Sequence, residues 1–311
     1  MTTSITDLPG NEYLLPGNRT CAGCGLAVAF RHILKALDGQ AILTIPASCL
    51  TVLGGMYPVS SVNLPWLNCA FPSTAATATG VLAGLRALGK SHVPVVAIAG
   101  DGGTLDIGIQ GLSGAAERNE DILYICYDNE AYMNTGTQRS GATPRGVRTA
   151  TTPVLGKQQN KKDMLRIMEA HQVGYIATAS PSYPGDLYDK VLKARDRKGL
   201  RYIHMHIPCP PGWSFPAADT IALGKLAVET GVFPLYEIDE GRFRFTGRSR
   251  GLAKSGQLKS LREYAGAQGR FKSLSDELLN DFEAGVRERW EQYRSRDLEG
   301  TESEEIPAGV Y

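Results

Sequence analysis

Short apolar segments alternate with longer amphipathic ones over the first two thirds of the chain, and this alternation limits the possible folds more than any other feature. Apolar runs bounded by turn residues predict strands, at residues 41–47, 94–100, 121–129, 174–180 and 201–208. Helical spacing of apolar residues predicts the helices between them, at residues 25–37, 73–88, 108–119, 161–171 and 186–199. We therefore expect an α/β fold, a mostly parallel sheet with helices on both faces.

Charge and hydropathy exclude several classes of protein. Lys and Arg number 33 against 32 Asp and Glu, so the net charge of +1 gives no general attraction for nucleic acid or anionic lipid. The longest apolar runs, such as residues 93–99, are far shorter than the roughly 20 residues of a membrane helix. The N-terminal segment lacks the basic start and apolar core of a secretory signal. We expect a cytoplasmic protein without nucleic-acid or membrane partners.

The C-terminal third differs in composition from the rest. After Trp213 we expect a short helix, a segment FPLYEID that forms an edge strand or an extended wrap, and a charged helix near residues 274–295. Residues 242–272 hold nine Lys or Arg and one acidic residue. We divide the chain into a ligand-binding domain, residues 1–216, and a C-terminal extension, residues 217–311, that packs on neighbouring subunits.

Two polar motifs each follow a predicted strand. The first comprises Gly100, Asp101, Gly102 and Gly103, and the second includes Asn129. Because the carboxyl ends of parallel strands meet at one edge of a sheet, we expect the two motifs to lie together. Glycines let the backbone approach a diphosphate closely. Asp101 and Asn129 offer oxygen ligands for Mg²⁺, and the carbonyl of Ala131 is a reasonable third.

The spacing of these motifs points to one cofactor. A Gly-Asp-Gly tripeptide alone is also an ordinary turn. Here 26 residues separate it from Asn129, which is followed by EAYMNTG. This arrangement resembles the motif of thiamine diphosphate enzymes. We therefore expect thiamine diphosphate bound with Mg²⁺.

The cysteines divide into two groups. Four lie in segments rich in Gly, Pro or Ser, namely Cys21, Cys24, Cys49 and Cys209. Four thiolates hold either zinc or a 4Fe-4S cluster, and the spacing alone does not decide between them or exclude an adventitious CxxC. Thiamine enzymes that decarboxylate 2-oxo acids can release electrons one at a time, and a nearby cluster would receive them, which favours the 4Fe-4S cluster. Cys69 and Cys126 lie in segments that look buried, and we expect them to be structural.

Five motifs in order resemble the β subunit of the 2-oxoacid:ferredoxin oxidoreductases, and most closely the pyruvate synthase type. They are CAGCG at 21–25, PASC at 46–49, GDGG at 100–103, DNEAYMNTGTQRSGATPRG at 128–146 and PCPPGW at 208–213. The resemblance covers about residues 10–240 and is loose beyond residue 241.

The resemblance implies roles for individual residues. The cluster near the cofactor would be held by Cys21, Cys24, Cys49 and Cys209, and the Mg²⁺ by Asp101, Asn129 and the carbonyl of Ala131. Asn134 would lie beside the thiazolium and the substrate. Ser48, Cys49 and Thr135 would lie near the cofactor.

The resemblance also implies a reaction and partners. The family oxidatively decarboxylates a 2-oxo acid with coenzyme A and passes the electrons through the 4Fe-4S cluster to ferredoxin. The glutamate that activates the aminopyrimidine belongs to the α subunit, and Glu130 is at the wrong end of the cofactor for this role. We therefore expect the chain to be inactive alone and to work with α, γ and δ-type subunits.

Several alternatives stay open at this point. Pyruvate is the favoured substrate, with oxalate, 2-oxoisovalerate and an aryl glyoxylate as alternatives. A non-redox thiamine decarboxylase or synthase with structural zinc is a second reading, and a zinc-stabilised interaction subunit without thiamine is a third. The basic stretch 242–272 docks an acidic subunit, ferredoxin or coenzyme A, or is a solvated face. The histidines form no cluster at ligand spacing and are expected to be structural, at 32, 92, 171, 204 and 206.

Overall fold

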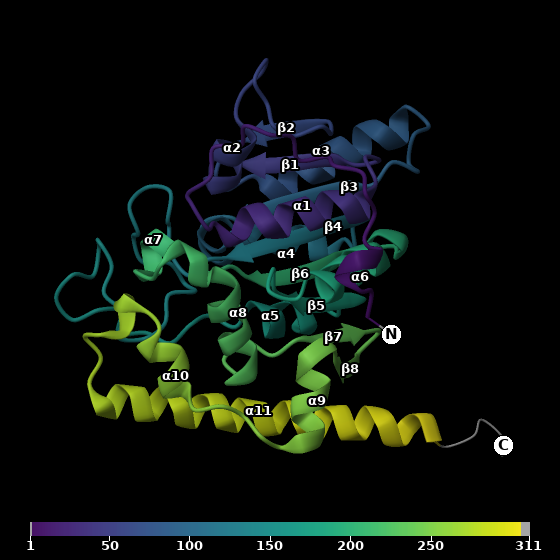
Figure 1. The fold of residues 1–311 in the computed structure, drawn as a ribbon. Helices are drawn as coiled ribbons and strands as arrows, with labels where there is room; N and C mark the ends of the chain where they lie inside the picture. The colour runs from purple at the N-terminus through teal and green to yellow at the C-terminus, as the bar shows by residue number, and fades with distance from the viewer. Residues whose placement is uncertain (1, 306–311) are drawn as a thin grey trace.

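Eight strands form one sheet in the computed structural model, which describes residues 2–305 and the side chains of residues 2–298. The strand order is β2-β1-β3-β4-β6-β5-β7-β8. The first six strands in this order pair in parallel. β7 pairs antiparallel with β5, and β8 pairs antiparallel with β7. The sheet is therefore mostly parallel, as predicted (Figure 1). The strands are β1 (Ile42–Pro46), β2 (Trp66–Cys69), β3 (Val95–Gly100), β4 (Ile122–Asp128), β5 (Tyr175–Ala179), β6 (Arg201–His206), β7 (Tyr236–Asp239) and β8 (Arg242–Phe245).

The burial of each strand explains whether it could be predicted from the sequence. Every residue of β3, β4, β5 and β6 is buried, so these strands read as continuous apolar runs. The edge strand β2 was not predicted, because its exposed Leu67 and Asn68 interrupt the apolar pattern. Cys69 on β2 is only half-buried, so its predicted burial was wrong. Cys126 on β4 is fully buried, as predicted.

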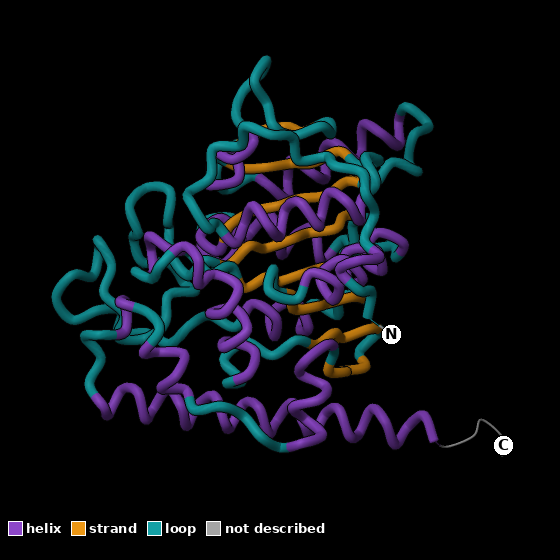
Figure 2. Tube along the Cα trace, in the orientation of Figure 1, coloured by secondary structure: helices purple, strands orange, loops and turns teal. Residues whose placement is uncertain are grey.

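Helices cover both faces of the sheet, as expected (Figure 2). One face packs against α1 (Gly25–Leu37) and α6 (Pro184–Asp196). The other packs against α3 (Thr74–Ala87), α4 (Ile109–Glu117) and α5 (Met164–Ala170). Short elements lie in the connections, namely η1 (Ile5–Asp7), α2 (Cys49–Gly54), the π-helical η2 (Gly102–Asp106), α7 (Pro210–Trp213) and η3 (Ala217–Asp219). Among the described helices, none combines the length and the apolar character needed to cross a bilayer.

The C-terminal extension continues the sheet of the first 216 residues. FPLYEID contains β7, which is not at the edge because the unpredicted β8 pairs beyond it. Aromatic side chains join these strands to the long terminal helix, with ring centroids 4.9 Å apart for Phe245 and Trp290 and 5.2 Å apart for Phe243 and Tyr293. The helices of the extension are α8 (Thr220–Glu229), α9 (Gly247–Ser255), α10 (Leu261–Gly266), η4 (Gly269–Phe271) and α11 (Asp276–Glu305).

Candidate functional site

A pocket opens at the carboxyl ends of β1, β3 and β4, and all ten residues predicted to bind the cofactor line it. We call it the strand-end pocket. The predicted residues are Ser48, Cys49, Gly100, Asp101, Gly102, Gly103, Asn129, Ala131, Asn134 and Thr135. They come from three separate parts of the sequence, so the parallel topology brings them together.

Sequence reasoning missed several aromatic and apolar residues of this pocket, which are Phe71, Tyr127, Tyr132 and Met133. Phe71 follows the unpredicted β2, so nothing in the sequence placed it near the site. Tyr132 packs against Gly102, where a Cβ atom would clash with the tyrosine ring. The hydroxyl of Tyr132 donates to Asp106 Oδ2 at 3.1 Å, which fixes the ring over the turn after β3. The glycine is therefore needed for close packing beside the pocket.

Three oxygen atoms converge at one end of the strand-end pocket. The side-chain oxygen of Asn129 lies 3.1 Å from Asp101 Oδ1 and 2.9 Å from the carbonyl oxygen of Ala131. In this orientation the amide oxygen faces only acceptors, and with the amide turned over its nitrogen donates to both. A carboxylate, a carboxamide oxygen and a carbonyl are the ligand types that Mg²⁺ prefers. The donor set therefore fits the metal predicted from the sequence.

Asp101 is held in a protected environment. Its side chain is buried, and Ser140 Oγ donates to its Oδ2 at 2.5 Å. Burial and the neighbouring charge of Asp128 raise the pKa of the Asp101 carboxyl well above its usual value. A cation between these oxygens would favour the ionised carboxylate, so cation binding and deprotonation of Asp101 are linked.

The four loop cysteines, which we call the thiol set, are Cys21, Cys24, Cys49 and Cys209. Burial raises the pKa of the Cys49 thiol to about 12, with further contributions from Cys209, Cys24 and Cys21. Burial likewise raises the pKa of Cys209 to about 11. The thiols are thus within electrostatic range of one another although they come from three parts of the chain.

Cys49 belongs to both the thiol set and the strand-end pocket. It is the first residue of α2, directly after β1. Across residues 2–305, no three His, Cys, Asp or Glu side chains are grouped as a single metal ion would require. The cluster ligands therefore stay a prediction from the sequence.

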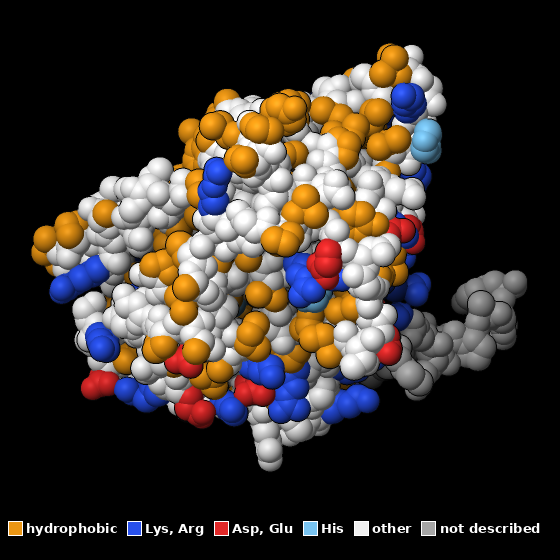
Figure 3. Space-filling view, turned by 45° about the horizontal axis from the view of Figure 1, so that its top comes forward, with side chains coloured by type: hydrophobic (Ala, Val, Ile, Leu, Met, Phe, Trp, Pro, Cys, Tyr) orange, Lys and Arg blue, Asp and Glu red, His pale blue; other side chains and the backbone are white. Residues whose placement is uncertain are grey.

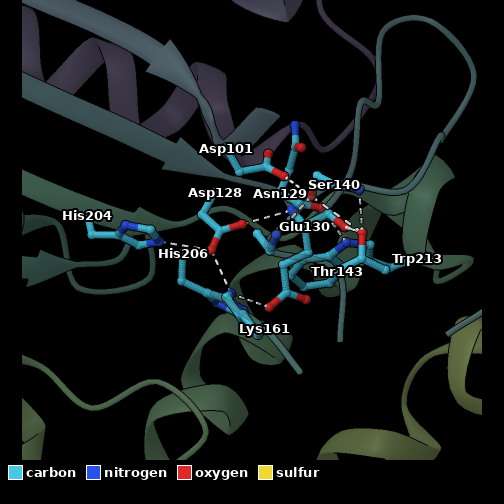
Figure 4. A network of polar contacts seen from close by, with 12 residues as sticks. Asp101, Asp128, Asn129, Glu130, Ser140, Thr143, Lys161, His204, His206 and Trp213 are labelled. Carbon is cyan, nitrogen blue, oxygen red and sulfur yellow. Dashed lines mark hydrogen bonds and ion pairs between the residues drawn. The ribbon is translucent and has the colours of Figure 1, made fainter. Parts of the chain in front are cut away.

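A group of ionisable side chains includes both chain neighbours of Asn129, and we call it the charge network; Figure 4 labels all of its members except Arg270. Its members are Asp128, Glu130, Lys161, His204 and Arg270. Lys161 Nζ lies 2.6 Å from Asp128 Oδ2 and 2.9 Å from Glu130 Oε1. His204 Nε2 is 2.9 Å from the same oxygen of Asp128. Arg270 Nη1 lies 2.5 Å from Glu130 Oε2.

The network keeps both carboxyl groups ionised. Burial alone would raise their pKa values, but Lys161 lowers the pKa of Asp128 with help from His204. Lys161 and Arg270 lower the pKa of Glu130 in the same way. The pairing of His204 with Asp128 has no signal in the sequence, because it crosses from β4 to β6.

Comparison with known proteins agrees with this geometry. Residues 48–205 match the family model described as "Thiamine pyrophosphate enzyme, C-terminal TPP binding domain". The chain is 51% identical over 274 residues to pyruvate synthase subunit PorB of Methanothermobacter marburgensis, covering 87% of this chain and 93% of that one. It is 45% identical over 296 residues to PorB of Methanocaldococcus jannaschii, covering 92% and 97%. The chain belongs to the 2-oxoacid:ferredoxin oxidoreductase β-subunit family.

Two further relatives describe the breadth of this family. Ketoisovalerate oxidoreductase subunit VorB of Pyrococcus abyssi is 41% identical over 297 residues, covering 92% of this chain and 94% of that one. A solved structure of 2-oxoglutarate:ferredoxin oxidoreductase from Magnetococcus marinus aligns with a TM-score of 0.58 at 21% identity, covering 82% and 89%. The latter supports the fold alone. As a family member, the chain is a subunit of an oxidoreductase with the thiamine diphosphate-enzyme fold.

Proposed function

We propose that this chain is the cofactor-binding subunit of an enzyme that oxidatively decarboxylates a 2-oxo acid with coenzyme A and passes the electrons to ferredoxin. The observation that carries the proposal is the double placement of Cys49, which lines the strand-end pocket and belongs to the thiol set. A 4Fe-4S cluster held by the thiol set would, in this arrangement, lie directly beside the cofactor. One-electron transfer between the two then needs no domain motion.

The residues of the pocket have distinct tasks in this proposal. Asp101, Asn129 and the Ala131 carbonyl would hold Mg²⁺ and, through it, the diphosphate. Thiamine diphosphate supplies an electron sink for the carbanion left by decarboxylation. Asn134 and Thr135, from the loop after β4, line the same pocket and would contact the reacting end of the cofactor or the substrate. Ser48, at the end of β1, would help to position the cofactor from the opposite wall.

The thiol set would hold the cluster as thiolates. Burial keeps the free thiols protonated, since it raises the pKa values of Cys24, Cys49 and Cys209. Iron binding therefore displaces protons, and cluster assembly should weaken at low pH. Four cysteine thiolates are the usual ligands of a 4Fe-4S cluster.

The strand-end pocket supports the need for a partner subunit. Among its described lining residues, Asp101 is the only carboxylate, and none is Lys, Arg or His. Asp101 is assigned to the metal, so the described lining of the pocket offers no second carboxylate for the aminopyrimidine and no cation for the substrate carboxylate. Both groups would come from an α-type subunit, with γ and δ-type subunits completing the complex.

An apolar surface beside the pocket fits this partner. Four apolar side chains of α2 and the loop after it are exposed, namely Val52, Met56, Tyr57 and Val59. Tyr57 is 94% exposed. Figure 3 shows hydrophobic side chains gathered at the top of its view, the side where α2 and β2 lie in Figure 1. Because α2 begins at Cys49, a subunit that covers this surface would also reach the pocket.

The basic stretch is a weaker candidate for docking. Four of its cations pair within the chain: Arg248 and Lys259 with Glu229, Arg262 with Asp276, and Arg270 with Glu130. Much of its charge is therefore neutralised locally. We keep the boundary at residue 216, the packing of residues 217–311 on other subunits and a cytoplasmic location as predictions.

Pyruvate is the substrate we propose. The relatives named pyruvate synthase reach 51% identity, and the one named ketoisovalerate oxidoreductase reaches 41%. The deciding residues would lie largely in the α-type subunit, so 2-oxoisovalerate is the second candidate. Oxalate and an aryl glyoxylate complete the set to be tested.

The test is anaerobic co-expression with the neighbouring genes, followed by measurement of iron, zinc and thiamine diphosphate in the purified complex. Viologen reduction is then assayed with coenzyme A and each 2-oxo acid. We expect about four irons assignable to this chain, bound cofactor, and reduction with pyruvate. Zinc in place of iron would overturn the redox proposal in favour of a non-redox thiamine enzyme. Zinc without bound thiamine would indicate an interaction subunit.

A further inference from the structure

Arg270 in η4 connects the C-terminal extension to the loop that follows β4. Its side chain is only 4% exposed, and its guanidinium makes four different contacts. Nη1 pairs with Glu130 Oε2 at 2.5 Å, and Nη2 donates to the Tyr264 hydroxyl at 3.2 Å. Nε donates to Gln268 Oε1 at 2.7 Å. The guanidinium carbon lies 3.7 Å from the centroid of the Trp213 ring.

Trp213 in turn contacts both parts of the site. Its indole Nε1 donates to the backbone carbonyl of Asn129 at 2.8 Å (Figure 4). Its backbone amide donates to the carbonyl of Cys209 at 2.9 Å. The ring is fully buried, and its centroid lies 5.2 Å from that of His206. Trp213 therefore joins a thiol-bearing segment, through its backbone, to the segment that carries the converging oxygens, through its indole.

The loop between these oxygens needs support from outside. Glu130 lies between Asn129 and Ala131 and has a φ of 66°, a left-handed conformation that is uncommon for a residue other than glycine. Its carbonyl accepts a hydrogen bond from Thr143 Oγ1 at 2.6 Å. Its buried carboxylate is compensated by Lys161 and Arg270. A buried carboxylate that lost one of these cations would favour a different conformation of the loop.

The geometry points to Arg270 as a positioning residue that sets the geometry of the Asn129–Ala131 segment through Glu130 and Trp213. The inference rests on the proposed function, because the segment matters only if it holds the Mg²⁺ and diphosphate. Arg270 is not among the described residues that line the strand-end pocket. The planar guanidinium pairs with a carboxylate and stacks on an indole at the same time, which a lysine ammonium cannot do. The extension thus controls cofactor affinity from outside the strand-end pocket.

The test compares Arg270→Met with Arg262→Met in the purified complex. Arg262 belongs to the same basic stretch, but it is half-exposed and pairs with Asp276 on the surface. The complexes are stripped of cofactor, and binding of thiamine diphosphate with Mg²⁺ is measured by calorimetry. We expect Arg270→Met to raise the dissociation constant about tenfold, the size of one hydrogen bond to a charged group. Arg262→Met should bind as the parent does.

Two further variants keep the test decisive if Arg270→Met does not fold. Trp213→Phe removes the indole donor to the Asn129 carbonyl and leaves a smaller aromatic ring beside Arg270, and we expect a rise of roughly fivefold in the dissociation constant. Arg270→Lys keeps the charge beside Glu130 and should fall between Arg270→Met and the parent. Combining Arg270→Met with Trp213→Phe should cost less than the sum of the two, because both act on one segment.

Turnover at saturating ligand and binding in the milder variants distinguish a positioning role of Arg270 from general damage to the fold. At saturating Mg²⁺ and cofactor, turnover of Arg270→Met should return to within about twofold of the control, since bound ligand reorders the segment. A damaged fold would leave turnover low at every concentration. If Arg270→Lys and Trp213→Phe both bind as tightly as Arg262→Met, the inference is wrong. If the parent complex takes up no thiamine diphosphate, the proposed function itself fails, which is a different result.

Discussion

The charge network and the strand-end pocket lie side by side and yet differ in how completely this chain supplies them. In the network, Asp128 and Glu130 are buried and each meets a cation from this same chain. In the pocket, one carboxylate stands among apolar and uncharged groups, and no described lining residue carries a positive charge. The carboxylates of the network are thus paired within this chain, whereas the described lining of the pocket contains no cation to pair with a bound anion. Under the proposed function, the chain would hold the diphosphate end of the cofactor, and a partner subunit would supply the groups at the reacting end.

The largest effect should come from replacing Asp101, the one carboxylate among the described residues that line the strand-end pocket. We expect Asp101→Ala to weaken binding of thiamine diphosphate with Mg²⁺ by at least about 100-fold, since it removes a metal ligand that is itself buried. Equilibrium dialysis of the stripped complex measures this. Asp276→Ala, an exposed change on α11, is the control. Equal binding in both variants would mean that Asp101 is no ligand.

Removal of a thiol should affect iron and leave the fold intact. Cys49→Ala should lose most of the iron and the low-temperature EPR signal of the reduced cluster, because a 4Fe-4S cluster needs four thiolates. Cys69→Ala is the matched control, since Cys69 is also half-buried but lies outside the thiol set. Unchanged iron content in Cys49→Ala would remove this residue from the ligand set.

The completeness of the charge network predicts a loss of stability when one cation is removed. Lys161→Met leaves Asp128 and Glu130 buried with fewer partners and should lower the free energy of unfolding by about 3 kcal/mol. Lys162→Met is the control, because the neighbouring lysine pairs with the more exposed Asp106. Urea denaturation compares the two variants. Similar stabilities would show that Lys161 is dispensable and the network less interdependent than its geometry indicates.

A smaller effect should appear in the pH dependence of stability. Burial lowers the pKa of Lys157 to about 8, and its ammonium donates to the carbonyls of Gly141 and Thr143 at 2.8 and 2.7 Å. Between about pH 8 and 10 the folded chain holds fewer protons on this group than the unfolded chain, so stability rises with pH. The rise should be on the order of 2 kcal/mol. Urea denaturation at about pH 8 and 10 should show this rise in the free energy of unfolding for the parent and not for Lys157→Met. An equal change of the free energy of unfolding with pH in both proteins would contradict the prediction.

Much of the fold and the pocket could be predicted because their signals are local. Buried parallel strands such as β3 and β4 read as apolar runs, and Asp101 and Asn129 stand directly at their ends. Because parallel strands bring their carboxyl ends to one edge of the sheet, these two residues could be predicted to lie together. The motifs and their spacing therefore placed residues 100–103, Asn129 and Ala131 at the pocket, and the family resemblance placed Ser48, Cys49, Asn134 and Thr135 there.

The features of the site that could not be predicted are contacts between segments far apart in the sequence. His204 meets Asp128 across two neighbouring strands, and Arg270 meets Glu130 from an element 140 positions away. Neither pair has a characteristic spacing, since each is set by tertiary packing. The edge strand β2 and the added strand β8 were missed for a related reason, because exposed positions break their apolar pattern.

The position of Cys49 at the junction of β1 and α2 has a consequence for how the proposed enzyme is assembled. A wall of the pocket and one proposed ligand of the cluster are neighbours on a single stretch of backbone that follows β1, the strand beside the edge strand β2. In the proposed enzyme, the distance for electron transfer would therefore be set by the folding of this one chain and would not depend on how tightly the subunits dock. Partner subunits could then change for new substrates without changing the electron-transfer rate.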